Sequence, residues 1–283
     1  MALTKEQIKE FKVAEKEAED CFDYCELAKQ VAAAGDKEWA KKLYEKAEAK
    51  SSKSGDETSD YCYLGDEIAA TGNKEWARKL YKKAEDSADM SCYFDVIATS
   101  VCKHLGDKKW AILMYKKAEA GADKEGDSEV LRGIADSICE QLGDKEWGKK
   151  LYKKSEDCAA GCDHITNLAE SVYTSIGDKK WAKKLLEKAE DCDDESEIFT
   201  NIANCLCKTL DDKIWAKKIF EQAEANAEAI YEFREIADGL SENLNDKKWA
   251  KKVFENVLKL AEKDDNYEAD DINEIKTRIK ELK

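Results

Sequence analysis

The sequence predicts an all-α fold in which seven similar helix-turn-helix repeats stack into an α-solenoid, between an N-terminal half-repeat and a C-terminal capping helix. Three observations lead to this prediction. The 283 residues include no proline and only 13 glycines, which favours continuous helices. The seven tryptophans follow one another at intervals of 37, 34, 37, 34, 34 and 34 residues, which is typical of a repeat array. Apolar residues recur at helical spacing and form no long runs.

All seven tryptophans lie in one motif, which reads GNKEWARKLYKKAE in the second unit and GDKKWAKKLLEKAE in the fifth. They are Trp39, Trp76, Trp110, Trp147, Trp181, Trp215 and Trp249. A residue that recurs at one position of every repeat is typically a packing residue. We therefore interpret the tryptophans as contacts between repeats rather than as a ligand cage.

The motif predicts the second helix of each unit, called helix B here. Four apolar residues of the second unit fall at i, i+3, i+4 and i+7, with Lys and Arg between them: Ala77, Leu80, Tyr81 and Ala84. The segment before the motif predicts helix A, whose apolar face in the fourth unit comprises Leu131, Ile134, Ala135, Ile138 and Leu142. Gly-Asp-Lys or a variant stands between the two helices. It predicts a tight turn, because glycine suits the end of one helix and Asp or Asn caps the start of the next.

A lone hairpin cannot bury its apolar face, so we expect the hairpins to share a core within one repeat domain over residues 1–283. Thr4 and Gln7 predict a capping box in an N-terminal cap helix (1–20) that serves as a half-repeat. A C-terminal cap helix (263–283) is predicted from the spacing of Ile272, Ile275, Ile279 and Leu282. The predicted repeats cover residues 21–57, 58–91, 92–128, 129–162, 163–196, 197–230 and 231–262.

The pattern resembles the tetratricopeptide repeat (TPR), with the best match in the second unit. The matching residues are Leu64, Gly65, Ile68, Gly72, Ala77, Tyr81 and Ala84. The resemblance implies a right-handed solenoid that binds peptides or proteins, usually in a groove lined by helix A. The family's proline at the repeat boundary is absent. From the third unit onward, one extra residue separates the small residue of helix A from the turn; these small residues are Ala98, Ala135, Ala169, Ala203 and Ala237.

Charge separates the two predicted helices of each unit. The whole chain has a net charge of −15, which opposes direct binding of nucleic acid. The seven A segments sum to −11 and the seven B segments to +11. An acidic helix A surface would attract a basic or neutral protein partner. The alternative is that these charges only solvate and support the helices, for example through i, i+4 pairs.

A stripe at 15, 11 and 7 residues before each tryptophan varies among the units and is predicted to point away from the core. Variable residues on a repeated frame are where we expect a binding surface. Two of the triads, Arg-Asp-Glu in both cases, can also be read as intrahelical ion pairs. The candidate residues are Asp95, Thr99, Lys103, Arg132, Asp136, Glu140, Thr166, Glu170, Thr174, Thr200, Asn204, Lys208, Arg234, Asp238 and Glu242.

The sequence indicates no catalytic or cofactor chemistry, since it contains no phosphate-binding loop, dinucleotide fingerprint or HExxH motif. Cys158, Cys162, His164 and Cys192 could form a soft metal site, but their spacing is no recognised zinc motif. Cys102, Cys139 and Cys207 recur at one position, which favours packing over a thiol ladder. The eleven cysteines are interpreted as reduced thiols.

The first hypothesis is therefore a noncatalytic protein-binding scaffold that holds its partner along helix A. The second is an acidic decoy that mimics nucleic acid and occupies a basic protein groove. A thiol or metal carrier is the third. The N-terminus shows no apolar signal segment and no stretch is long enough to span a membrane, so we expect a cytoplasmic protein without a membrane partner.

Overall fold

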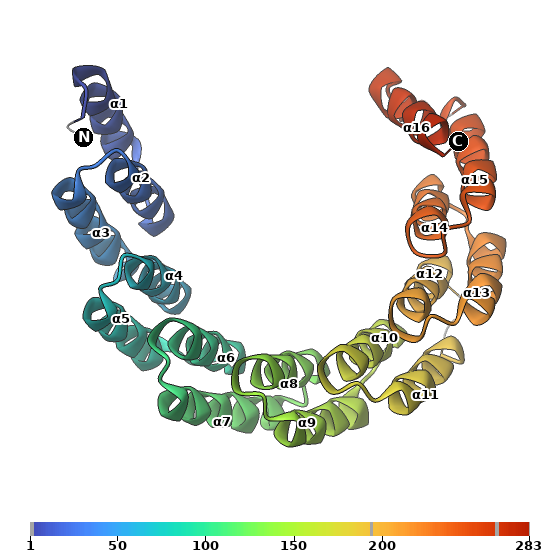
Figure 1. Cartoon of the computed structure of the whole chain (residues 1–283), viewed down its shortest axis with the longest axis horizontal. Coiled ribbons are helices and arrows are strands. Elements are labelled where there is room, and N and C mark those ends of the chain that lie inside the picture. The colour runs from blue at the N-terminus through green and yellow to red at the C-terminus, as the bar shows by residue number, and fades with distance from the viewer. Residues whose placement is uncertain (1–2, 193–194, 264–265, 283) are drawn as a thin grey trace. The chain divides into compact units, whose positions relative to one another are not determined.

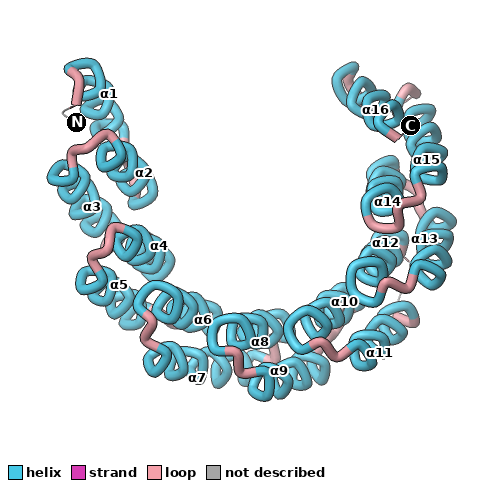
Figure 2. Tube along the Cα trace, in the orientation of Figure 1, coloured by secondary structure: helices cyan, strands magenta, loops and turns pink. Residues whose placement is uncertain are grey.

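The computed structural model describes residues 3–192, 195–263 and 266–282, and in these ranges it contains sixteen α-helices, three π-helical turns and no strand. The predicted all-α repeat fold is confirmed. Consecutive helices pack as hairpins joined by short turns (Figures 1 and 2). None of the described helices is long and apolar enough to cross a membrane.

The chain forms two compact units, Met1–Gly126 with Ser137–Asp144, and Asp127–Asp136 with Lys145–Lys283. The helix α8 (Ser128–Leu142) contributes residues to both. The first unit contains α1 (Lys5–Glu17), α2 (Cys21–Ala33), α3 (Lys37–Ser51), α4 (Glu57–Ala70), α5 (Lys74–Ser87), α6 (Ser91–Ser100), η1 (Val101–Leu105) and α7 (Lys108–Glu125). The second contains α9 (Lys145–Cys158), α10 (Cys162–Ser171), η2 (Val172–Ile176), α11 (Lys179–Glu190), α12 (Ser196–Cys205), η3 (Leu206–Leu210), α13 (Lys213–Asn226), α14 (Ile230–Glu242), α15 (Lys247–Ala261) and α16 (Ala269–Glu281).

Within each unit the helices form two rows. The A row, made of even-numbered helices, includes α2, α4 and α6 in the first unit and α10, α12 and α14 in the second. Successive helices of the A row pack against one another more extensively than successive helices of the odd-numbered B row do. The apolar faces between the rows are buried, as Leu80 and Tyr81 of α5 and Ile97 of α6 illustrate.

The turn inside each hairpin follows the predicted chemistry. Asp178, the residue before α11, accepts a hydrogen bond from the backbone N–H of Trp181 at 3.1 Å, and Asn73 caps α5 in the same way. Gly177 ends the preceding helix with a φ of 83°. In the sixth and seventh units Asp211 and Asn245 take this left-handed conformation instead, which Asp and Asn tolerate better than most other residues.

The extra residue in helix A of the later units has a visible structural outcome. In the third, fifth and sixth units helix A ends in the π-helical turns η1, η2 and η3, each five residues long. In the seventh unit the backbone N–H of Leu244 bonds to the carbonyl of Gly239, five residues earlier, at 3.1 Å. A π-turn absorbs one additional residue without rotating the rest of the helix. The small residues Ala98, Ala169 and Ala203 therefore remain buried.

The tryptophans join consecutive hairpins through a hydrogen bond that the motif alone did not predict. The indole Nε1 of Trp215 donates to Oε2 of Glu190 at 2.9 Å, and Glu190 lies on the preceding helix B. Trp39, Trp76, Trp110, Trp181 and Trp249 bond in the same way to Glu15, Glu48, Glu85, Glu156 and Glu224. The first acceptor, Glu15, belongs to α1, so the N-terminal helix takes the place of a helix B. The tryptophans are thus contacts between repeats, as predicted.

Candidate functional site

The fifteen candidate residues lie on helices of the A row, but their exposure differs. Those exposed to solvent are Lys103, Glu140, Glu170, Thr174, Lys208 and Glu242. Those half-buried are Asp95, Thr99, Arg132, Asp136, Asn204, Arg234 and Asp238. For Thr166 and Thr200 the predicted exposure was wrong, since both are buried. Their hydroxyls donate to the carbonyls of Cys162 and Ser196, four residues earlier, so each satisfies its polar group within its own helix.

Tyrosines of the B row bond to polar side chains of the A row in two consecutive hairpins of the first unit, and one of these side chains, Thr99, is a candidate residue. The hydroxyl of Tyr81 donates to Oδ1 of Asp66 at 2.7 Å, and that of Tyr115 lies 3.0 Å from Oγ1 of Thr99. The partners are 15 residues apart in the first pair and 16 in the second, which again reflects the additional residue of the later units. These bonds hold Asp66 and Thr99 against buried tyrosines of the core.

Asp136 is the centre of a polar network in the second unit. Its Oδ2 accepts from Nη1 of Arg132 and from the hydroxyl of Ser171, both at 3.0 Å, and its Oδ1 accepts from the hydroxyl of Tyr152. Nη2 of Arg132 bonds to Glu129 at 2.7 Å. The predicted intrahelical pair of Arg132 and Asp136 is therefore confirmed. Through these partners Asp136 links α8 to α9 and α10.

The second Arg-Asp-Glu triad forms a different set of ion pairs. Arg234 bonds to Glu274 of α16 at 3.0 Å. Arg278, also from α16, donates to Asp238 and, at 3.0 Å, to Glu242. The interpretation as intrahelical pairs was wrong here, because the capping helix supplies opposite charges that the sequence spacing did not reveal.

Several aromatic and charged residues of the first unit extend the A surface and were missed in the sequence. The rings of Phe22 and Tyr63 lie 4.4 Å apart, and Phe22 is 47% exposed. Lys29 pairs with Glu26 at 2.7 Å and with Glu67 at 2.9 Å. A stripe shifted by one position in the first two units would include Lys29 and Asp66, whereas Phe22, Glu26, Tyr63 and Glu67 lie at other positions relative to the tryptophan.

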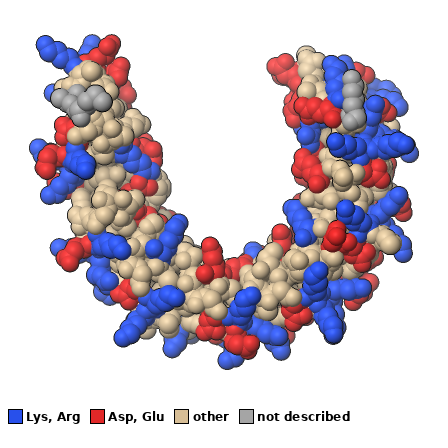
Figure 3. Space-filling view, in the orientation of Figure 1, with Lys and Arg blue, Asp and Glu red and all other residues tan. Residues whose placement is uncertain are grey.

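The A row of the second unit has an acidic exposed surface. The exposed charged residues of α10, η2, α12, η3 and α14 are one cation, Lys208, and five carboxylates. These carboxylates are Asp163, Glu170, Glu197, Glu235 and Glu242. Burial, together with the nearby charges of Glu197, Glu232 and Asp238, raises the pKa of Glu235. Lysine side chains project from the side of α11 and α13 (Figure 3).

The cysteines form no metal site among the residues that the structure describes, and all eleven are free thiols. Cys158 and Cys162 lie at the end of α9 and the start of α10, whereas Cys192 is exposed beyond α11. Burial raises the pKa of Cys62 and of Cys205 to about 12. A thiol with such a pKa stays protonated at neutral pH, and a protonated thiol is neither a strong nucleophile nor a metal ligand.

Comparisons with known proteins concern the fold. No protein-family model matches the sequence, and no curated protein matches it. Among solved structures, the chain is similar to the C-terminal part of a TPR repeat-containing protein from Cytophaga hutchinsonii, with 15% identity and a TM-score of 0.41 over 88% of this chain and 98% of that chain. It is also similar to an assembly chaperone of RpL4, with 13% identity and a TM-score of 0.31 over 93% and 96% of the two chains. The paired helices themselves show an all-helical architecture of stacked hairpins.

Proposed function

We propose that the chain is a noncatalytic scaffold that binds a protein or peptide along its A row. The observation that carries this proposal is the contrast between a constant frame and a variable face. The caps, the tryptophan–glutamate bonds and the buried small residues repeat from hairpin to hairpin. The solvent-facing side chains of the A row differ in every hairpin. Such an arrangement presents different side chains at fixed spacing, which suits recognition of an extended partner.

In the second unit the proposed partner carries basic side chains. The exposed carboxylates of α10, α12 and α14 would attract it and raise its association rate, while rim charges of this kind add little affinity each. The raised pKa of Glu235 supports this proposal, because a nearby cation would relieve the repulsion among its acidic neighbours. A cytoplasmic location is part of the proposal, since eleven free thiols suit a reducing compartment.

The test compares two charge-reversal variants with the same net charge. One carries Glu170→Lys, Glu197→Lys and Glu235→Lys on the A row. The control carries Glu187→Lys, Glu221→Lys and Glu255→Lys, which are equally exposed on α11, α13 and α15. The probe is a fluorescein-labelled 12-residue peptide of alternating Lys and Ser, and its binding is followed by fluorescence anisotropy.

We expect the A-row variant to lose about tenfold or more in affinity, with a smaller change in the control. Circular dichroism should show equal helicity in both variants. Equal weakening in the two variants would mean that only the net charge of the chain matters and would contradict the proposed surface. Unchanged binding in the A-row variant would do so as well.

A further inference from the structure

The third repeat departs from the motif at two exposed positions. Where the other six units have Lys-Lys or Arg-Lys two and three residues after the tryptophan, this unit has Ile112 and Leu113. Both lie on the solvent side of α7, and they are 36% and 52% exposed. Since a basic residue at these positions is compatible with the fold in six repeats, the fold does not require the apolar pair.

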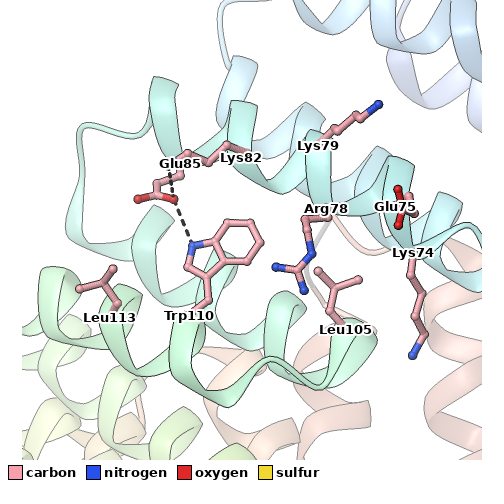
Figure 4. Close-up of a pocket in the computed structure, with 9 residues that line it drawn as sticks. All are labelled: Lys74, Glu75, Arg78, Lys79, Lys82, Glu85, Leu105, Trp110 and Leu113. Carbon is pink, nitrogen blue, oxygen red and sulfur yellow. Dashed lines mark hydrogen bonds and ion pairs between the residues drawn. The ribbon is translucent and has the colours of Figure 1, made fainter.

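Leu113 borders a pocket of about 730 Å³ on the B row of the first unit, between α5 and α7 (Figure 4). Leu105, Trp110 and Leu113 supply its apolar lining. Figure 4 shows the indole of Trp110 between the two leucines, with its Nε1 directed toward Glu85. The pocket is therefore an apolar depression on a face that is otherwise rich in lysine.

Basic side chains lie along the α5 side of this depression. Lys74, Arg78 and Lys82 of α5 line one side of it, and all three are exposed. Arg78 is positioned by a bond from its Nη1 to Asp107 at 2.9 Å and lies over the ring of Trp110, 5.5 Å from the centroid. Its side chain remains 52% exposed, so the guanidinium can still reach a ligand.

Two acidic residues, Glu75 and Glu85, also line the pocket, and they are outnumbered by four basic residues of α5, Lys74, Arg78, Lys79 and Lys82. Glu85 accepts from Trp110 and pairs with Lys117 at 2.7 Å and Lys82 at 2.9 Å. Its side chain is only 9% exposed. A ligand in the pocket therefore meets apolar carbon and more exposed cations than exposed carboxylates, of which Glu75 is one.

We propose that this pocket binds an acidic segment of another protein that carries one or two large apolar side chains. An apolar side chain of that segment enters between Leu105, Trp110 and Leu113, and its Asp or Glu residues pair with Arg78 and the neighbouring lysines. Apolar anchors in a pocket provide most of the energy in such contacts, and the flanking charges orient the ligand. This surface is distinct from the acidic A row and takes a partner of opposite charge.

A membrane surface fits these observations less well. The apolar pair is small and lies beside a concave pocket rather than on a broad apolar face, which is the usual feature of interfacial helices. The net charge of −15 also opposes adsorption to anionic lipid. The charges around the pocket complement a short acidic peptide, which needs no large contact area.

The test uses three fluorescein-labelled peptides of 12 residues. The first alternates Asp-Glu pairs with Leu-Phe pairs, the second replaces Leu and Phe by Ser, and the third replaces Asp and Glu by Lys. Binding to the full chain is measured by anisotropy. We expect the first peptide to bind at least about tenfold more tightly than either of the others.

The decisive variant is Ile112→Lys with Leu113→Lys, which restores the lysines of the other repeats and adds two positive charges. Binding driven by charge alone would become tighter, whereas an apolar anchor predicts a loss of about tenfold or more. Arg78→Glu should also weaken binding. The control, Lys183→Ser with Lys184→Ser at the equivalent positions of α11, should leave it unchanged.

Three outcomes would overturn the proposal. The first is equal or tighter binding of the acidic peptide to the Ile112→Lys, Leu113→Lys variant. The second is binding of the native chain, but not of this variant, to vesicles of phosphatidylcholine and phosphatidylserine, which would identify a membrane surface. The third is self-association of the native chain in sedimentation velocity that the variant abolishes, which would identify a contact between copies.

Discussion

The hydrogen bond from a tryptophan to a glutamate of the preceding odd-numbered helix recurs at Trp39, Trp76, Trp110, Trp181, Trp215 and Trp249. Its acceptor could have been found in the sequence, because Glu stands nine residues after the tryptophan in the first six units. The seventh unit has Leu258 at that position. The sequence predicted the tryptophans as packing residues but not this bond, because a polar partner in a neighbouring repeat cannot be derived from periodicity alone.

Replacing one acceptor should destabilise the chain. We expect Glu190→Leu to lower the free energy of unfolding by about 1 to 3 kcal/mol, since the half-buried indole N–H of Trp215 would lose its partner. The exposed Glu187 of the same helix provides a matched control in Glu187→Leu. Urea unfolding followed by circular dichroism measures both. Equal stability of the two variants would show that the bond contributes nothing.

The buried tyrosine hydroxyls make stability dependent on pH in the alkaline range. Burial, and next the hydrogen bond to Asp66, raises the pKa of Tyr81, and burial also raises the pKa of Tyr44 to about 12. Tyrosines of the unfolded chain ionise near ~10. The stabilisation is therefore complete below about pH 10 and is lost as the pH rises above that value.

Tyr81→Phe should flatten this dependence. We expect the urea midpoint of the native chain to fall more steeply between about pH 10 and 11.5 than that of the variant, because the variant has no phenol to ionise. Tyr267→Phe, in the connection before α16, should retain the native slope. Parallel curves for the native chain and Tyr81→Phe would contradict the argument.

At the scale of the element, the sequence predicted the helical hairpins well because their determinants are local. Apolar spacing, the capping Asp or Asn, and glycine at the turn each act within a few residues. The π-turns were not predicted. The sequence showed an additional residue in helix A, yet how a helix accommodates an insertion depends on the core on both sides of it.

A pair of single-residue deletions tests this account. Removing the exposed Thr174 from η2 should leave cooperative thermal unfolding within about 5 °C of the native midpoint, because the first two units make the same turn with one residue fewer. Removing the equally exposed Lys183 from α11 rotates the rest of that helix by about 100° and should abolish cooperative unfolding. Circular dichroism during heating measures both. Similar effects of the two deletions would contradict the proposed role of the π-turn.

For the whole molecule, the sequence predicted the order of the hairpins and both capping helices. The candidate surface was predicted less completely. Its stripe was placed on the A row, but Thr166 and Thr200 proved buried, and Asp238 and Glu242 proved to be paired with Arg278. These outcomes depend on neighbouring helices far away in the sequence, which the pattern within one repeat does not describe.

The C-terminal helix α16 should contribute to stability mainly by covering α15. Its Ile275 is 1% exposed and its body packs against α15. A chain that stops at Lys263 should melt about 5 to 10 °C lower and bind more of the dye ANS, because the end of the array would be uncovered.

Arg278→Ala provides the comparison. It removes the ion pairs with Asp238 and Glu242 but keeps the apolar cover of α15. We therefore expect the free energy of unfolding to fall by only about 1 kcal/mol, with a smaller drop in melting temperature than in the shortened chain. If Arg278→Ala melted as low as the shortened chain, the ion pairs rather than Ile275 would account for the stabilisation.

Leu258 occupies the position at which other units have the glutamate that accepts from the next tryptophan. The hairpin of α14 and α15 has no carboxylate to offer a following tryptophan, and Trp39 already has Glu15 of α1. Each of these bonds runs from a tryptophan back to the preceding odd-numbered helix, and α15 offers no glutamate at the matching position for a further bond of this kind. A duplicated internal hairpin should keep the tryptophan–glutamate bond at both of its junctions. A hairpin added after α15 would need Leu258→Glu to form that bond.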